Sequence, residues 1–505
     1  MILRHIFPAL ALALLTAACG GGDDAATGKL DVVVISPGET VFLPLNGEWP
    51  LLPELVAGSV SRGLVKFDGN GQIVPDLATS WRVSDDGRSI IFRLRKAQWS
   101  DGRAVTGDDF VRLFRSALSP QSRHPYKALL SVIENGEAIG AGKKPPGALG
   151  VTTPIAEALE IRLSAPSPDL LQVLAQPAMG ISDRNMSRFA VGPFRFTNKD
   201  GEIALTPNAG YDDPGSVQLR RINLNAEPDT AIALRNFKQR HARLLLGGST
   251  GDFQLARATA LDRFVRLDPV RGIYGYRFDN LKGPLADARV RQALAMVINR
   301  EAVASATGAG TASPVYGVVS WSLAELPQPA VPDWSKMNVA DRLTDARQLM
   351  RSALGDNAAP LTIAVALPNA PGHAAILKQV AAAWAQLGVV VKEVRAGSRA
   401  ADLSVIETVA PSDSAIWFLN QYRCRKNGYC NPQVDALLDQ ARSAADGGAR
   451  RRALALAERL VLTDQPIIAL FTPIRWSMVD PNVLGWSDNA LAQHPLAALS
   501  VIGGP

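Results

Sequence analysis

Residues 63–120 read GLVKFDGNGQIVPDLATSWRVSDDGRSIIFRLRKAQWSDGRAVTGDDFVRLFRSALSP, the most densely patterned stretch of the chain. Gly69-Asn70-Gly71 and Asp85-Asp86-Gly87 are residues that accept the backbone conformations of tight turns. Short apolar and β-branched runs lie around them, and these runs predict three strands, the last two joined as a hairpin: residues 65–68, 81–83 and 89–95. In the last run, Ile91 faces away from Phe92 and Leu94 because successive side chains of a strand alternate between its faces.

A helix is expected directly after these strands. Thr106 is a good N-cap, and Asp109, three residues later, completes the pattern of a capping box. The apolar residues that follow recur at helical spacing and predict one buried face: Phe110, Leu113, Phe114, Ala117 and Leu118.

This order of elements resembles the extracytoplasmic solute-binding proteins of the peptide/nickel ABC-importer family, and within it the oligopeptide-binding type. Two parts of the family pattern, P-x-L-A-x-S-W and W-S-D-G-x-x-x-T-x-x-D-F, fall on residues 75–81 and 99–110. A second hallmark, P-x-x-D-x-R-V-R-x-A-L…I-D-R, falls on residues 284–300, with Asn299 in place of the second Asp. The resemblance covers about residues 45–500 and is weakest around the expected pocket.

The resemblance implies an α/β fold of the periplasmic-binding-protein type, a two-lobe clamp with mixed sheets, flanking helices and a hinge between the lobes. A strand-helix-strand pattern within residues 361–391 independently predicts part of an α/β lobe. The expected boundaries are a signal peptide at 1–18, a flexible tether at 19–29, a first lobe at 30–270 with a small subdomain at about 60–182, a second lobe at 271–473, and a segment returning to the first lobe at 474–505.

Composition is ordinary for a globular protein of two or three domains. Of the 505 residues, 47% are apolar and 20% are charged, and the net charge is +6. The arginines are scattered along the chain, without the basic stripe and interleaved aromatics of a nucleic-acid groove. We therefore expect no nucleic-acid partner.

The N-terminus has the features of a bacterial lipoprotein signal. Basic residues precede an apolar run from Ile6 to Ala18, which is too short to span a bilayer and is typical of a signal peptide. Residues 15–19 (LTAAC) resemble a lipobox, with Thr16 where a Leu is usual. The resemblance implies cleavage before Cys19 and lipidation of its thiol, which would anchor the protein on the periplasmic side of a bacterial membrane. A free Cys19 after ordinary signal cleavage is the alternative.

Cys424 and Cys430 remain, in a polar loop. Outside the cytoplasm two close cysteines favour a disulfide. A metal pair is the rival, but two thiolates without a nearby His or further Cys make only half of a zinc site. We expect the disulfide, and no metal or cofactor.

Ligand-binding candidates follow from the resemblance, since oligopeptide binders hold the peptide between the lobes through its backbone and its end charges. They lie in the first lobe, on the interlobe strand and along one edge of the second lobe: Tyr126, Tyr274, Tyr276, Glu407, Thr408, Val409, Ala410, Asp413 and Trp417. Each has a structural alternative: Tyr274 and Tyr276 alternate on one strand, so at least one is a candidate for the core, and Trp417 is a candidate for packing a helix.

The expected pocket departs from the family pattern at its second-lobe edge. Where the family shows G-W-x-A-D-Y, this chain has Thr408 at the Trp and Pro411 at the acid that grips the α-amino group of a peptide. Asp413 is the nearest substitute for that acid.

Two short motifs suggest other chemistry and carry little weight. Gly140-Ala-Gly142-Lys143 lacks the Ser/Thr and the glycine spacing of a phosphate-binding loop. Residues 247–251 (GGSTG) match the G-x-S-x-G of a serine hydrolase, but only His373 and His494 lie downstream and neither is in a suggestive setting. We expect a turn at Ser249, no catalytic residue and no enzyme.

The leading hypothesis is thus a lipid-anchored solute-binding protein that delivers oligopeptides or a related small solute to an ABC permease and its ATPase. The alternative is a diverged family member that binds a ligand without a free α-amine, or an interaction lipoprotein without a transported solute. A serine hydrolase is a remote third.

Overall fold

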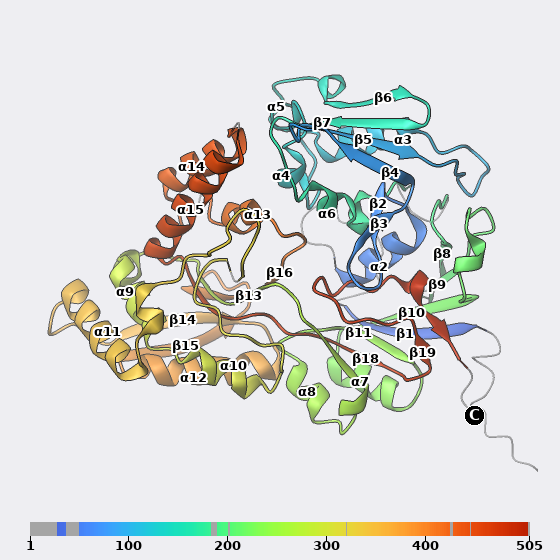
Figure 1. Cartoon of the computed structure of the whole chain (residues 1–505). Coiled ribbons are helices and arrows are strands. Elements are labelled where there is room, and N and C mark those ends of the chain that lie inside the picture. The colour runs from blue at the N-terminus through green and yellow to red at the C-terminus, as the bar shows by residue number, and fades with distance from the viewer. Residues whose placement is uncertain are drawn as a thin grey trace, which may run out of the picture.

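The computed structural model describes residues 28–36, 50–182, 189–199, 202–319, 321–424, 428–444 and 446–502. The expected signal peptide, Cys19 and most of the tether lie outside these residues. Two mixed sheets and a smaller antiparallel sheet organise the described part of the chain (Figure 1). This confirms the expected α/β architecture with two lobes.

The first lobe is built on a seven-stranded mixed sheet among the described residues. In spatial order its strands are β12 (Val265–Asp268), β18 (Arg475–Val479), β11 (Leu244–Gly248), β1 (Lys29–Ile35), β10 (Arg221–Glu227), β9 (Glu202–Pro207) and β8 (Phe194–Lys199). β1 pairs in parallel with both β10 and β11, and a buried apolar strand at the sheet centre is expected of that arrangement. The helices of this lobe are α2 (Leu51–Val60), α7 (Thr230–Lys238) and α8 (Phe253–Arg257).

The second lobe has a five-stranded sheet among the described residues. Its spatial order is β15 (Val389–Arg395), β14 (Leu361–Leu367), β16 (Leu403–Val409), β13 (Gly272–Phe278) and β17 (Ile467–Phe471). One face packs against α9 (Ala288–Met296), α10 (Arg300–Thr307), α11 (Val339–Leu354) and α12 (Pro371–Ala385). The other face packs against α13 (Ala415–Asn420), α14 (Pro432–Ser443) and α15 (Gly447–Asp464).

A subdomain with its own apolar core projects from the first lobe. Its antiparallel sheet has the order β4 (Ala78–Val83), β5 (Ser89–Leu94), β7 (Ala158–Arg162) and β6 (Val151–Ile155). Around it lie the β2–β3 ribbon (Val65–Phe67 and Ile73–Pro75) and the helices α3 (Gly107–Ala117), α4 (Lys127–Leu130), α5 (Gly136–Gly140) and α6 (Leu170–Leu174). Figure 1 shows this subdomain above α2, with α14 and α15 beside it.

The local predictions for the stretch 63–120 are confirmed in this subdomain. β4 and β5 form the expected hairpin, although β4 begins at Ala78, three residues earlier than the pattern indicated. Phe92 is fully buried whereas Ile91 is 47% exposed, as the alternation predicted. Thr106 and Asp109 form the capping box of α3.

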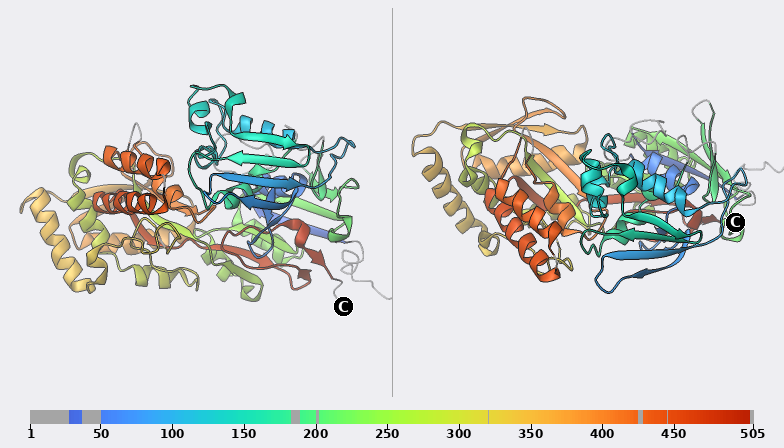
Figure 2. Two further views of the ribbon diagram at one scale, coloured as in Figure 1. Left: turned by 45° about the horizontal axis from the view of Figure 1, so that its top comes forward. Right: turned by 90° about the horizontal axis from the view of Figure 1, so that it is seen from above.

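The chain crosses between the lobes at two described places, from β12 to β13 and from β17 to β18. The expected boundaries at 270 and 473 fall in these two connections. After β18 the chain stays with the first lobe, where β19 (Val483–Leu484) pairs with β20 (Ser500–Val501). The lobes also meet through side chains: Arg442 of α14 and Glu137 of α5 form an ion pair of 3.0 Å, and Figure 2 shows α14 and α15 next to the subdomain.

Candidate functional site

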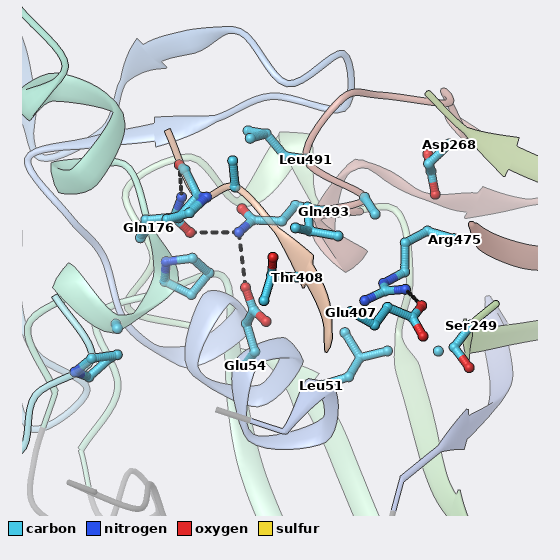
Figure 3. Close-up of a pocket in the computed structure, with 18 of the residues that line it drawn as sticks. Leu51, Glu54, Gln176, Ser249, Asp268, Glu407, Thr408, Arg475, Leu491 and Gln493 are labelled. Carbon is cyan, nitrogen blue, oxygen red and sulfur yellow. Dashed lines mark hydrogen bonds and ion pairs between the residues drawn. The ribbon is translucent and has the colours of Figure 1, made fainter. Parts of the chain in front are cut away.

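A cavity of about 1050 Å³ lies between the two lobes (Figure 3). The first lobe contributes the N-terminal turn of α2, the end of β11, the start of β18 and residues 491–494. The subdomain contributes residues 123–126 and 176–178, and the second lobe contributes 406–411 and part of the segment 417–422. A space of this size, lined from both lobes, is suited to a small ligand whose contacts favour the closed arrangement.

One edge of β16 lies along this cavity. β13 pairs with β16 over its whole length, whereas β14 pairs with it only at Leu403 and Ser404. The Ala410 N–H donates to the carbonyl of Arg271, so alternate residues of β16 pair with β13. The backbone N–H and C=O groups of Glu407 and Val409 therefore point to the opposite edge of β16. Among the described residues no strand pairs with that edge beyond Ser404.

Ionisable side chains of the cavity form two pairs. Glu407 accepts a hydrogen bond from Arg475, and its Oε1 also accepts one of 3.1 Å from the Thr250 N–H. His494 Nε2 lies 3.0 Å from Asp268 Oδ2. Arg475 and Glu407 come from different lobes, so their contact is made across the cavity.

A row of side chains links Glu54 to the end of β16 (Figure 3). Gln493 Nε2 donates to Glu54 Oε1 at 2.9 Å and to Gln176 Oε1 at 2.6 Å. Gln176 Nε2 in turn donates to the carbonyl of Pro411 at 2.6 Å. Burial raises the pKa of Glu54 to about 7. The Tyr126 hydroxyl donates to Gln176 Oε1 at 3.3 Å, and burial, together with nearby Glu54, raises the pKa of this tyrosine.

Gln172 and Gln176, which we call the glutamine pair, both reach the second lobe. Gln172 Nε2 donates to Asp413 Oδ2 at 3.3 Å, and Gln172 Oε1 accepts from the Asp413 N–H. With the bond from Gln176 to Pro411, three hydrogen bonds join the subdomain to the segment after β16. The structure is therefore in a closed arrangement at this side of the cavity.

Six of the nine expected ligand-binding residues line the cavity: Tyr126, Glu407, Thr408, Val409, Ala410 and Trp417. The second-lobe edge was thus located from the family pattern even though its residues differ from that pattern. Of the six, Glu407 directs its side chain into an ion pair with Arg475, and Trp417 packs its ring edge-to-face on Phe418.

Tyr274 and Tyr276 do not line the cavity, contrary to the expectation. Both are fully buried, in the apolar core that β13 shares with the helices α9 to α12. The Tyr274 hydroxyl lies 2.9 Å from His373 Nδ1, and its ring stacks on Phe471. Tyr276 packs beside Trp384. Tyr274 and Tyr276 are two residues apart on β13, so their side chains lie on the same face of the sheet. Helices cover both faces of this sheet, and the two side chains are therefore buried in a core.

Asp413 is also placed elsewhere. Its carboxylate pairs with Arg271 and accepts from Gln172, and it does not belong to the cavity lining. Its charge is already compensated within the protein, so it is a poor substitute for the acid expected to bind a ligand amine. Pro411 offers its carbonyl, which accepts from Gln176.

The G-x-S-x-G match has a structural explanation. Gly247 has φ +95°, a conformation that favours glycine, and a Cβ on Gly248 would lie 2.1 Å from the Trp476 ring. Ser249 Oγ donates to Asp252 at 3.3 Å, and His373 is bonded to Tyr274. The glycines thus serve a close packing of β11 on β18, and Ser249 has no histidine base among the described residues.

Other expectations concern single features. Cys424 and Cys430 form a disulfide. In the described part of the chain, no group of three or more His, Cys, Asp or Glu is arranged to hold a metal ion. No described helix is long and apolar enough to cross a membrane.

Sequence reasoning missed most of the lining outside the second-lobe edge, including the four residues that make the polar contacts described above: Glu54, Gln176, Arg475 and Gln493. Each lies in a segment without a distinctive motif. Of these four, Glu54 has a sequence signal, because it is the acid in the first turn of a largely apolar helix, LLPELVAGSV.

Comparisons with known proteins give a consistent result. A family model described as bacterial extracellular solute-binding proteins, family 5 Middle, matches residues 72–423. The chain is 26% identical over 480 residues to the periplasmic murein peptide-binding protein MppA of Escherichia coli (strain K12), covering 87% of each chain. It is 27% identical over 470 residues to the probable deoxycholate-binding periplasmic protein YgiS of the same strain, covering 84% of each.

Solved structures share the fold. OppA of Burkholderia pseudomallei superposes with a TM-score of 0.80 at 25% identity, over 94% of this chain and 99% of that one. Escherichia coli MppA superposes with a TM-score of 0.81 at 23% identity, over 94% and 99% of the two chains. Its unliganded open form gives 0.69 at 24% identity, over 94% and 98%. The overall superposition is thus poorer on the open form.

Proposed function

The chain belongs to the bacterial extracellular solute-binding proteins of family 5, and on that premise we propose that it binds peptides between its lobes and delivers them to an ABC importer. Binding occurs by hinge closure, in which a ligand that contacts both lobes shifts the population toward the closed form. The protein releases its ligand unchanged to the permease. Peptide binding by relatives such as MppA supports the ligand class.

The observation that carries the proposal is the free edge of β16 along the cavity. An extended peptide that adds to a strand edge gains main-chain hydrogen bonds whatever its side chains are. The peptide groups of Glu407 and Val409 are turned to that edge, and β14 does not cover it beyond Ser404. Such binding accepts many sequences, as an importer of mixed peptides requires.

The test is an N-methyl scan of a peptide that binds, followed by isothermal titration calorimetry. An extended peptide on a strand edge directs every second N–H to that strand. Methylating those N–H groups should weaken binding about tenfold each, and methylating the alternate ones should have a smaller effect. A scan without any period-two pattern would contradict main-chain pairing with β16.

The lipid anchor is part of the same proposal. It rests on the apolar run and on Cys19 within LTAAC. Mass spectrometry of the mature N-terminus should find a diacylglyceryl-modified Cys19, and Cys19→Ala should release the protein from the membrane fraction. If the mature wild-type protein instead begins at another residue and carries no lipid, the segment is an ordinary signal peptide.

A second candidate is a ligand without a free α-amine. Two observations favour it: the end of β16 has Pro411, and the carboxylate of Asp413 is already paired with Arg271. YgiS, a relative of similar identity, is named as a probable deoxycholate-binding protein. Calorimetric titration with deoxycholate beside a peptide pool separates the candidates, because a peptide receptor should give heat only with the pool. An interaction lipoprotein should bind neither, and neighbouring permease and ATPase genes would argue against it.

A further inference from the structure

Glu54 differs from the other carboxylates that line the cavity. Glu407 is paired with Arg475, and Asp268 lies against His494. Glu54 forms no ion pair among the described residues, and its side chain accepts one described hydrogen bond, from the Gln493 amide. Within the described part of the chain it is therefore a cavity acid without a cationic partner.

The surroundings of Glu54 are unfavourable for a lone carboxylate. It lies in the first turn of α2, next to the buried side chains of Leu52 and Leu55. The neighbouring Gln493 amide donates one of its two N–H groups to Glu54 and the other to Gln176 Oε1, so it has no further hydrogen for this carboxylate. A carboxylate offers about four lone pairs, and the described hydrogen bond occupies one of those on Glu54. An uncompensated carboxylate held in a low-dielectric site attracts a cation strongly.

The position of Glu54 relates it to the β16 edge. Gln493 and Gln176 connect its Oε1 to the carbonyl of Pro411, just past the end of β16 (Figure 3). We propose that Glu54 binds an ammonium group of the ligand at this end of the cavity. This inference rests on the proposed peptide function. If the group is the α-amine, the first residue of the peptide lies near Pro411 and the peptide runs antiparallel to β16.

The test uses three tripeptides that differ in where they carry an ammonium group: Ala-Ala-Ala has it at the N-terminus, acetyl-Ala-Ala-Ala has none, and acetyl-Lys-Ala-Ala has it on the first side chain. Their affinities are measured by calorimetry near neutral pH for the wild type and for Glu54→Gln. The matched control is Glu202→Gln, an exposed Glu on β9 with no described side-chain bond. Since glutamine has the shape of glutamate, Glu54→Gln removes the charge with little change in packing. Far-ultraviolet circular dichroism checks that the variant folds.

For the wild type we expect acetylation to weaken binding about ten- to a hundredfold, the range of a hydrogen bond to a charged group. In Glu54→Gln this difference should vanish, whereas Glu202→Gln should keep it. If acetyl-Lys-Ala-Ala binds the wild type about as tightly as Ala-Ala-Ala does, the bound group is a side-chain ammonium. If it binds as weakly as acetyl-Ala-Ala-Ala, the bound group is the α-amine. Either result supports the proposal.

Two results would overturn the inference and leave peptide binding intact. One is a wild type that binds acetylated and free tripeptides equally, and the other is a Glu54→Gln variant that keeps the full preference for the amine. If none of the tripeptides and no peptide pool binds the wild type, the peptide function itself fails, and the assignment of Glu54 fails with it.

Discussion

The glutamine pair offers a direct test of how closure is stabilised. Gln172 and Gln176 are four residues apart, at and just after α6, and both bond to the segment that follows β16. Replacing both by alanine removes the three hydrogen bonds that join the subdomain to that segment. At about 1 kcal/mol of net free energy each, their loss disfavours the closed form by about 3 kcal/mol. That corresponds to about a hundredfold in the ratio of closed to open molecules.

Small-angle X-ray scattering measures this shift through the radius of gyration, and calorimetry measures its effect on ligand affinity. Because the ligand binds the closed form, the shift in closure alone should lower its affinity by up to the same factor. Gln176 also lines the cavity, so scattering is the readout that isolates closure. The matched control replaces Gln433 and Gln440, two exposed glutamines of α14, by alanine and should change neither quantity. An alanine double variant at the glutamine pair with unchanged scattering and affinity would refute the assigned role of these contacts.

Three further changes test the stability of the fold. Glu458 is 1% exposed, and burial raises its pKa to about 7, so the wild type loses stability as the pH rises from about 4.5 to about 7. In urea unfolding, Glu458→Gln should therefore be more stable than the wild type by up to about 3 kcal/mol at pH 8, and no more stable at pH 4. Arg300 is fully buried and donates to several backbone carbonyls, so Arg300→Met should cost about 2–5 kcal/mol, and an unchanged urea midpoint would contradict this. Replacing Cys424 and Cys430 by serine opens a short loop and should cost about 2 kcal/mol, whereas adding a reductant to this variant should have no further effect on its stability.

The parts of the fold that were predicted correctly depend on local interactions. The turn at Asp85-Asp86-Gly87 sets the β4–β5 hairpin, and Thr106 with Asp109 sets the start of α3. Each signal lies within a few residues of the structure it determines. The two-lobe arrangement came from the family resemblance, because pairings such as β11 with β18 join segments more than 200 residues apart and leave no local pattern.

The candidate site was predicted less completely, for the same physical reason. The β16 edge was located because its sequence aligns with a family motif. The error at Tyr274 arose because strand alternation does not tell which face of a sheet is covered, and here helices cover both. Asp413 was overvalued because its partner Arg271 is 142 residues away. Glu54 was missed because its interest lies in the lack of a cationic partner among the described residues, and this becomes visible only once the chain is folded.

The central claim, that the interlobe cavity binds peptides, is tested most directly by native mass spectrometry. The protein is purified without refolding from cells grown in a peptide-rich medium and analysed intact, and bound species are then released and fragmented. We predict a ladder of co-purified masses that fragment as peptides of mixed sequence. A protein that is empty and stays empty when peptides are added, or one that carries a single non-peptide mass, would contradict the claim.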